Sequence, residues 1–166
     1  LVGLPFYHRG MLLNCAAVVQ NGKLHGLVPK TYIPNYKEFY ERRWFTSSTD
    51  LHEAETIRFC GQSVLLSTQQ LFKHRDTMFG IEICEDLWAP IPPSNRAVLE
   101  GAEIIFNLSA SNDLVGKNDY VRNLVTGQSA RCHCAYVYAG CGYGESTQDV
   151  VFGGKAFIAE NGRLLA

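Results

Sequence analysis

The stretch Gly80-Ile81-Glu82-Ile83-Cys84-Glu85-Asp86-Leu87-Trp88 decides how this chain folds and what it can do. Residues 78–83 form a short apolar run typical of a β-strand, in which successive side chains point to opposite faces of a sheet. Cys84 follows that run, so it can meet a cleft instead of the core. A free cysteine is usually a small buried hydrophobe. Two acids directly after it argue against a plain core position, and Cys84 is therefore a candidate nucleophile.

Strand-like and helix-like segments alternate along the rest of the chain. Two apolar runs flank Asn21-Gly22, a strong hairpin signal because both positions tolerate positive φ, and they predict an antiparallel pair over 14–20 and 24–28. The other expected strands are 63–66, 78–83, 103–108 and 135–139, and the expected helices are 94–101 and 117–134. Mixed strands and helices of this kind predict a layered α/β fold.

The second expected helix and the two chain ends carry further signals. The helix over 117–134 is predicted from apolar residues at spacings near 3.6, namely Tyr120, Leu124, Val125 and Ala130. Residues 36–45 are expected to form a loop or a short helix. Residues 155–166 resemble a hairpin cut short after its Asn161-Gly162 turn, and residues 1–5 begin in a strand-like run. We expect the chain to be a piece of a longer protein.

Composition excludes several classes of partner. The chain has 166 residues, 46% of them hydrophobic, which suits one domain with a real core. Fifteen Lys and Arg against 16 Asp and Glu leave a net charge of -1, so no basic field indicates nucleic acid or a membrane surface. No apolar run approaches the ~18 residues needed to span a bilayer. A small-molecule partner is the expectation.

Six cysteines without a recognisable secretion signal predict reduced thiols and a cytoplasmic protein. Cys132-His133-Cys134 and Cys141 are residue types that bind zinc, but paired C-x-x-C spacing is missing. We therefore predict no metal site, and we expect Cys132 and Cys134 on one face of a strand entering the core. The glycine-rich segment 140–146 lacks a following Lys-Ser/Thr pair, so a connection near an active-site rim is preferred over a phosphate loop.

Three motifs in order suggest a family: residues 28–43 (VPKTYIPNYKEFYERR), residues 83–88 (ICEDLW) and residues 107–111 (NLSAS). In this order they resemble the nitrilase superfamily of carbon–nitrogen hydrolases, and most of all the glutaminase domains of glutamine-dependent NAD synthetases. The resemblance implies an α-β-β-α sandwich. It also implies that residues 1–166 are part of one such domain, whose N-terminal part and following synthetase domain lie outside this chain.

The resemblance assigns a catalytic set. Cys84 corresponds to a nucleophile that attacks the side-chain amide of glutamine and forms a thioester, and Lys30 to a cation that favours the thiolate and holds the oxyanion. The backbone N–H of Glu85 is the expected second oxyanion donor. Glu41 resembles an auxiliary glutamate that orients the lysine, with Glu38 as second choice. The general base is expected before Leu1, because no glutamate precedes Lys30.

The resemblance also suggests substrate contacts and partners. Tyr36, Glu85 and Ser111 correspond to glutamine-binding positions, and Lys117 stands where some members have arginine, which keeps the charge but loses bidentate geometry. Taken alone, Tyr36 could equally be a packed aromatic. No cofactor is expected here. ATP and Mg²⁺ are expected in the synthetase domain of the same polypeptide, and a homo-oligomer is expected by analogy.

Two alternatives from the residues stay open. The chain could belong to a free-standing nitrilase-like amidase acting on another small amide, although segments 38–43 and 107–111 favour the synthetase type. It could also be a non-catalytic scaffold domain, since the base is missing from the sequence given.

Overall fold

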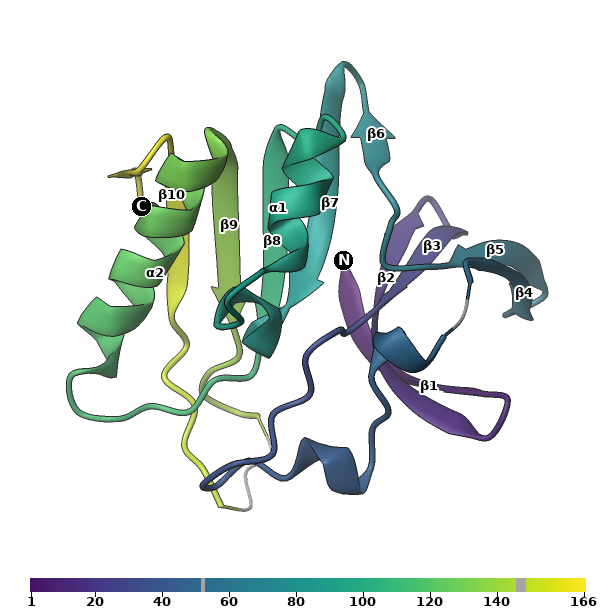
Figure 1. Ribbon diagram of the computed structural model, residues 1–166, viewed down its shortest axis with the longest axis horizontal. Helices are drawn as coiled ribbons and strands as arrows, with labels where there is room; N and C mark the ends of the chain where they lie inside the picture. Colours follow the sequence, from purple (N-terminus) through teal and green to yellow (C-terminus); the bar gives the residue numbers. More distant parts are fainter. Residues whose placement is uncertain (52, 146–148) are drawn as a thin grey trace. The chain divides into compact units, whose positions relative to one another are not determined.

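The computed structural model describes residues 1–51, 53–145 and 149–166. It divides into two compact units, Leu1–Gln70 and Leu71–Ala166, each with its own sheet and hydrophobic core (Figure 1). Two sheets combined with helices confirm the predicted α/β class.

The first unit is built on a five-stranded sheet with the order β1-β2-β3-β5-β4. Its strands are β1 (Val2–His8), β2 (Met11–Gln20), β3 (Lys23–Pro29), β4 (Glu55–Phe59) and β5 (Gln62–Leu66). The hairpin expected around Asn21-Gly22 is confirmed, with φ of 49° and 73° at the two turn residues. Positive φ at both positions gives a turn whose twist matches the flanking strands.

The core of this unit follows from alternation along β2. Leu13, Cys15 and Ala17 lie on one face and are at most 2% exposed. Burial raises the pKa of the Cys15 thiol to about 12, as expected for a cysteine that acts as a hydrophobe. Strand β3 ends at Pro29, so Lys30 is the first residue beyond the sheet.

The second unit is built on a six-stranded sheet with the order β11-β10-β9-β8-β7-β6. Its strands are β6 (Phe72–His74), β7 (Thr77–Ile83), β8 (Ile104–Ser109), β9 (Ala135–Gly140), β10 (Ala156–Glu160) and β11 (Arg163–Leu164). The three central strands, β7, β8 and β9, run parallel, so their carboxyl ends share one edge of the sheet. In open α/β sheets this is the edge where ligands bind.

Two helices, α1 (Pro93–Leu99) and α2 (Lys117–Cys132), cover one face of that sheet (Figure 1). The buried residues of α2 are Val121, Val125, Gln128, Ser129 and Cys132. Of the four apolar residues whose spacing predicted this helix, Tyr120 and Ala130 are exposed. Polar Gln128 and Ser129 face inward instead, so apolar spacing alone did not locate the packed face.

Helix α2 also ends earlier than expected. His133 adopts a left-handed conformation with φ of 48° and caps the helix, so Cys134 lies beyond it. Cys132 and Cys134 are both buried, but Cys132 ends α2 and Cys134 lies just beyond it, so neither lies on a strand, which corrects the expectation. Among the described residues, no helix is both long and apolar enough to cross a bilayer.

Candidate active site

Cys84 is one of eight non-glycine residues in the described ranges whose φ is positive. Cys84 follows β7 directly and begins the 3₁₀ helix η3 (Cys84–Leu87), and its φ is 45°. A left-handed conformation costs a non-glycine residue roughly 1–2 kcal/mol, and conformations of this kind cluster at functional sites. The half-buried thiol therefore departs from the in–out alternation of the strand, at the edge of the sheet where the parallel strands have their carboxyl ends.

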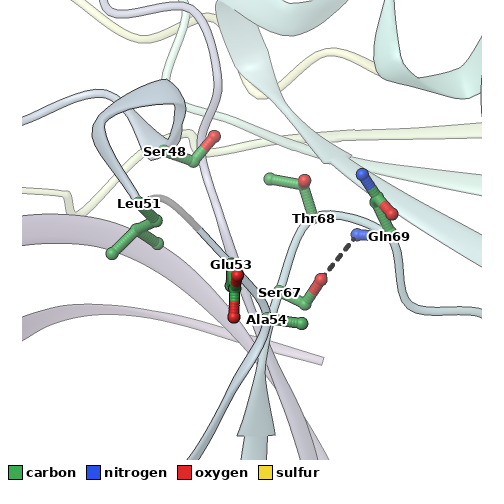
Figure 2. A pocket seen from close by; sticks show the side chains of 7 residues that line it. All are labelled: Ser48, Leu51, Glu53, Ala54, Ser67, Thr68 and Gln69. Carbon is green, nitrogen blue, oxygen red and sulfur yellow. Dashed lines mark hydrogen bonds between the residues drawn. The ribbon is translucent and has the colours of Figure 1, made fainter.

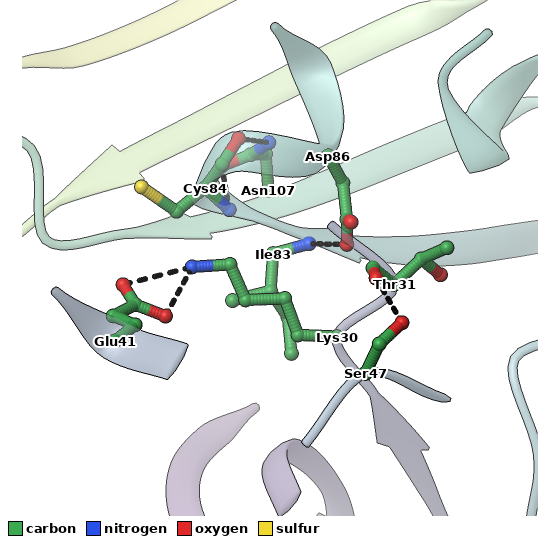
Figure 3. Close-up of polar contacts among 8 residues, drawn as sticks. All are labelled: Lys30, Thr31, Glu41, Ser47, Ile83, Cys84, Asp86 and Asn107. Carbon is green, nitrogen blue, oxygen red and sulfur yellow. Dashed lines mark hydrogen bonds and ion pairs between the residues drawn. The ribbon is translucent and has the colours of Figure 1, made fainter. Parts of the chain in front are cut away.

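Asn107 on β8 holds this backbone on both sides (Figure 3). The N–H of Cys84 donates to Asn107 Oδ1 at 3.2 Å, and Asn107 Nδ2 donates to the Cys84 carbonyl at 3.5 Å. Ser109 Oγ donates to the same Asn107 Oδ1 at 2.8 Å. Asn107 is only 1% exposed, so its amide is a fixed support for Cys84.

A buried polar layer continues from Asn107. Its Nδ2 donates to Tyr136 Oη at 3.1 Å, and the Tyr136 hydroxyl donates to Glu82. Glu82 Oε2 accepts from the N–H of Ser94 at 2.8 Å. Burial raises the pKa of Glu82, and the hydrogen bonds from Tyr136 and Ser94 act in the opposite direction. The pKa of Tyr136 is raised by burial and then by the neighbouring Glu82.

The 3₁₀ helix η3, which begins at Cys84, is stabilised by the carboxylate of one of its own residues, Asp86. Asp86, 2% exposed, accepts from the N–H of Ile83 through Oδ2 at 2.9 Å (Figure 3). Asp86 therefore has a structural contact at the turn. Glu85, its neighbour, is half-buried.

The next parallel strand brings the other expected residues of this unit to the same edge. Ser111 is half-buried and follows β8 by two residues. Lys117 begins α2, and its Nζ donates to the side-chain oxygen of Asn112, which is 3% exposed. The Lys117 ammonium is thus held by a neutral amide.

Within the first unit, Lys30 and Glu41 form a close ion pair (Figure 3). Lys30 Nζ donates to both carboxylate oxygens of Glu41, at 3.0 and 2.8 Å. The lysine side chain is 1% exposed and the glutamate side chain 27%. The backbone of Lys30 is also fixed, because its N–H donates to the carbonyl of Asn14 at 2.7 Å and its carbonyl accepts from Ser48 at 3.1 Å.

The segment around this pair explains why Glu41 can reach Lys30. Glu41 begins the 3₁₀ helix η1 (Glu41–Arg43), within the stretch where a loop or short helix was expected. Its N–H donates to the carbonyl of Pro34 at 3.2 Å, which closes the loop. Tyr36 in this loop is 47% exposed and meets Phe39 edge to face at 5.9 Å between ring centroids. Glu38, the second choice for the auxiliary acid, is half-buried.

A separate hollow of about 280 Å³ lies in the first unit (Figure 2). It is lined by Ser48, Leu51, Glu53, Ala54, Ser67, Thr68 and Gln69. None of the residues expected at the active site lines it. Among the described residues, no cluster of three or more His, Cys, Asp or Glu side chains could hold a metal ion. Ser146, at the end of the glycine-rich segment, lies outside the described residues.

Sequence reasoning missed the support beneath Cys84. Each of the three supporting residues, Glu82, Asn107 and Tyr136, lies inside an apolar strand. A single polar residue in such a strand forms no periodic pattern that would predict a role for it. A buried charge or amide in a strand is rare unless it is hydrogen-bonded, and that rarity was the available clue.

Comparison with known proteins gives a consistent result. No protein-family profile matches the chain. The chain is 44% identical over 169 residues to the glutamine-dependent NAD(+) synthetase of Mycobacterium bovis, and this match covers 100% of the chain and 25% of that protein. The chain therefore spans about a quarter of the length of the curated relatives it matches.

Solved structures extend the match to the fold. A glutamine-dependent NAD(+) synthetase from Cytophaga hutchinsonii has a TM-score of 0.86 at 31% identity, over 99% of this chain and 26% of that one. A nitrilase-superfamily protein from Saccharomyces cerevisiae has a TM-score of 0.71 at 14% identity, over 98% of this chain and 52% of that one, and shows the fold alone. The resemblance read from the three sequence motifs is thus confirmed: this chain has the nitrilase-superfamily fold and matches, over its whole length, one segment of the glutamine-dependent NAD(+) synthetases.

Proposed function

We propose that this chain is part of the glutaminase domain of a glutamine-dependent NAD(+) synthetase. The observation that carries the proposal is the 44% identity over the whole chain to a synthetase of that name. The left-handed Cys84 at the carboxyl edge of a parallel sheet supports it, because a nucleophile needs such an accessible and fixed position.

In the proposed reaction the Cys84 thiolate attacks the side-chain amide carbon of glutamine. The C–S bond forms while the carbonyl π electrons move to oxygen, which gives a tetrahedral oxyanion. Collapse of this oxyanion breaks the C–N bond, and the nitrogen leaves as ammonia after taking a proton. Water then hydrolyses the thioester, which releases glutamate and restores the thiol.

Lys30 is proposed to favour the thiolate and to hold the oxyanion, with the backbone N–H of Glu85 as a second donor. The close Lys30–Glu41 pair supports an orienting role for Glu41, because two hydrogen bonds restrict where the ammonium lies. The general base is proposed to be a glutamate outside this chain. Cys84, Lys30 and Glu41 can act together only if the two units meet at one site, and that meeting is part of the proposal.

Tyr36, Glu85, Ser111 and Lys117 are proposed to bind glutamine. An acid suits the α-ammonium group of glutamine and a cation suits its α-carboxylate. Ammonia would pass to a synthetase domain of the same polypeptide, which would bind ATP and Mg²⁺ and amidate deamido-NAD. A homo-oligomeric state and a cytoplasmic location stay predictions.

The decisive test uses the full-length protein with Cys84→Ala. This variant should lose NAD synthesis from glutamine but keep synthesis from added ammonia, because the synthetase chemistry does not need the thiol. Glutamate release and NAD formation are measured in parallel. Cys60→Ala serves as a matched control, since Cys60 is an exposed cysteine in the β4–β5 turn.

Three results would contradict the proposal in different ways. Glutamate release that persists in Cys84→Ala would exclude this thiol as nucleophile. Wild-type protein that hydrolyses other small amides but not glutamine would favour a free-standing amidase. Wild-type protein inactive on every amide would favour a scaffold domain.

A further inference from the structure

The backbone of Cys84 needs external support. A left-handed conformation is intrinsically unfavourable for cysteine and persists only where its surroundings hold it. Asn107 contacts both polar backbone groups of Cys84, the N–H at 3.2 Å and the carbonyl at 3.5 Å. The residue that fixes the nucleophile is thus on the neighbouring strand.

We propose that Asn107 is a positioning residue that aims the Cys84 thiol at the substrate carbonyl, and that Tyr136 and Glu82 fix the orientation of the Asn107 amide. This inference rests on the proposed function of Cys84. It assigns a role to a polar layer that the reaction steps do not use.

The direction of the hydrogen bonds supports the proposal. The Cys84 N–H and the Ser109 hydroxyl both donate, so the oxygen of the Asn107 amide must face them. The amide nitrogen then faces Tyr136, whose oxygen accepts from it at 3.1 Å. The Tyr136 hydroxyl has its own proton left to donate, and Glu82 accepts it. Reversing the Asn107 amide would break contacts at both ends.

Burial makes this layer rigid. Glu82, Asn107 and Tyr136 are 1%, 1% and 0% exposed. Glu82 and Asn107 are direct partners in the register of β7 and β8, so the layer lies in the sheet two residues before the nucleophile. A displacement of about 1 Å in a reacting group can reduce a rate by about a hundredfold. Loss of this support should therefore affect turnover more than substrate affinity.

The first test is Asn107→Ala in the full-length protein. We expect kcat for glutamine hydrolysis to fall about 10- to 100-fold with little change in KM, while ammonia-dependent NAD synthesis is retained. The matched control is Gln70→Ala. Gln70 is also a buried amide, it lies in the first unit, and its Nε2 donates to the carbonyls of Leu27 and Ser67. This control should lose comparable stability and keep its kcat.

A second pair of variants removes single tyrosine hydroxyl groups. Tyr136→Phe deletes the hydroxyl that links Asn107 to Glu82 and should lower kcat by several-fold. Tyr120→Phe is the control, because Tyr120 lies on α2 and is 55% exposed. A third variant, Asn107→Asp, keeps the shape and the accepting oxygen of the side chain. Its kcat is measured if Asn107→Ala fails to fold.

A thiol-specific readout separates positioning from activation. The pH dependence of Cys84 alkylation by iodoacetamide, followed by mass spectrometry of its peptide, should keep the same midpoint in Tyr136→Phe as in wild type. Wild-type kcat in a folded Asn107→Ala variant, or equal kcat losses in Gln70→Ala or Tyr120→Phe, would overturn the proposal. A failure of the proposed function would look different, because wild type would then not hydrolyse glutamine or Cys84→Ala would still do so.

Discussion

The Lys30–Glu41 ion pair is predicted to respond very differently to the loss of each partner. Lys30 is 1% exposed and Glu41 is 27% exposed. Removing the glutamate leaves an ammonium group that water cannot reach. Removing the lysine leaves a carboxylate that water can partly solvate, so the two single substitutions should not be equivalent.

The magnitudes follow from this asymmetry. Losing one partner of a buried pair typically costs about 3–5 kcal/mol in the free energy of unfolding, so Glu41→Leu should cost about 3 kcal/mol or more. Lys30→Met should cost only about 1 kcal/mol, because pairs reached by water contribute little. The double variant Lys30→Met/Glu41→Leu has no buried unpaired charge. It should be more stable than Glu41→Leu alone by about 2 kcal/mol.

Native-state hydrogen exchange of peptides from residues 24–45, in the full-length protein, measures these differences locally. Glutaminase kcat is measured on the same samples and should fall about a hundredfold or more in both proteins that carry Lys30→Met, whatever their stability. Arg9→Met is the control, because Arg9 pairs with Glu55 at 3.0 Å but is 70% exposed.

Two outcomes would refute this reasoning. Equal destabilisation by Glu41→Leu and Lys30→Met would show that burial does not control the cost. A double variant less stable than Glu41→Leu would show that the pair contributes more than it costs to bury.

Two further predictions concern the second unit. Gly80→Ala should destabilise the protein by about 1–3 kcal/mol in chemical denaturation, because the new Cβ would lie 2.9 Å from Ala97 Cβ; Gly3→Ala, with nothing within 4 Å, should be nearly neutral. Burial raises the pKa of Glu82, so the native state holds this proton to higher pH than the unfolded chain. Its contribution to stability is therefore complete below the unfolded pKa of about 4.3 and is lost as pH rises through the native value. In thermal melts, the Tm of wild type should fall relative to that of Glu82→Gln as pH rises through the native pKa of Glu82. A difference in Tm that does not change with pH would contradict this prediction.

Much of the fold could be predicted because local signals and tertiary packing agreed. Asn21-Gly22 identified its hairpin, and the apolar run before Cys84 identified β7. Strands β4 and β6 were not predicted, because they are short and their sequences, ETIRF and FKH, are dominated by polar residues. The end of α2 was missed because its left-handed cap is a histidine and not the usual glycine.

Cys84 was singled out by its position at the end of an apolar run, but the rest of the candidate site was predicted from motif order and not from physical pattern. Lys30 looks like a solvated lysine in the sequence, yet its side chain is almost fully buried against Glu41. Only contacts between segments distant in the sequence could reveal this burial. The same holds for the contact between Cys84 and Asn107, which are 23 positions apart in the sequence. Such long-range pairs are invisible to a reading based on local spacing.

The left-handed backbone at Cys84 has a consequence for how this sequence can change over time. Glycine would adopt the same conformation at no steric cost, so selection for stability alone would favour glycine at this position. If the proposed reaction is correct, catalysis keeps the cysteine in place against that pressure. Copies of the gene released from selection for catalysis would then be expected to lose their thiol early, and to gain stability as they do.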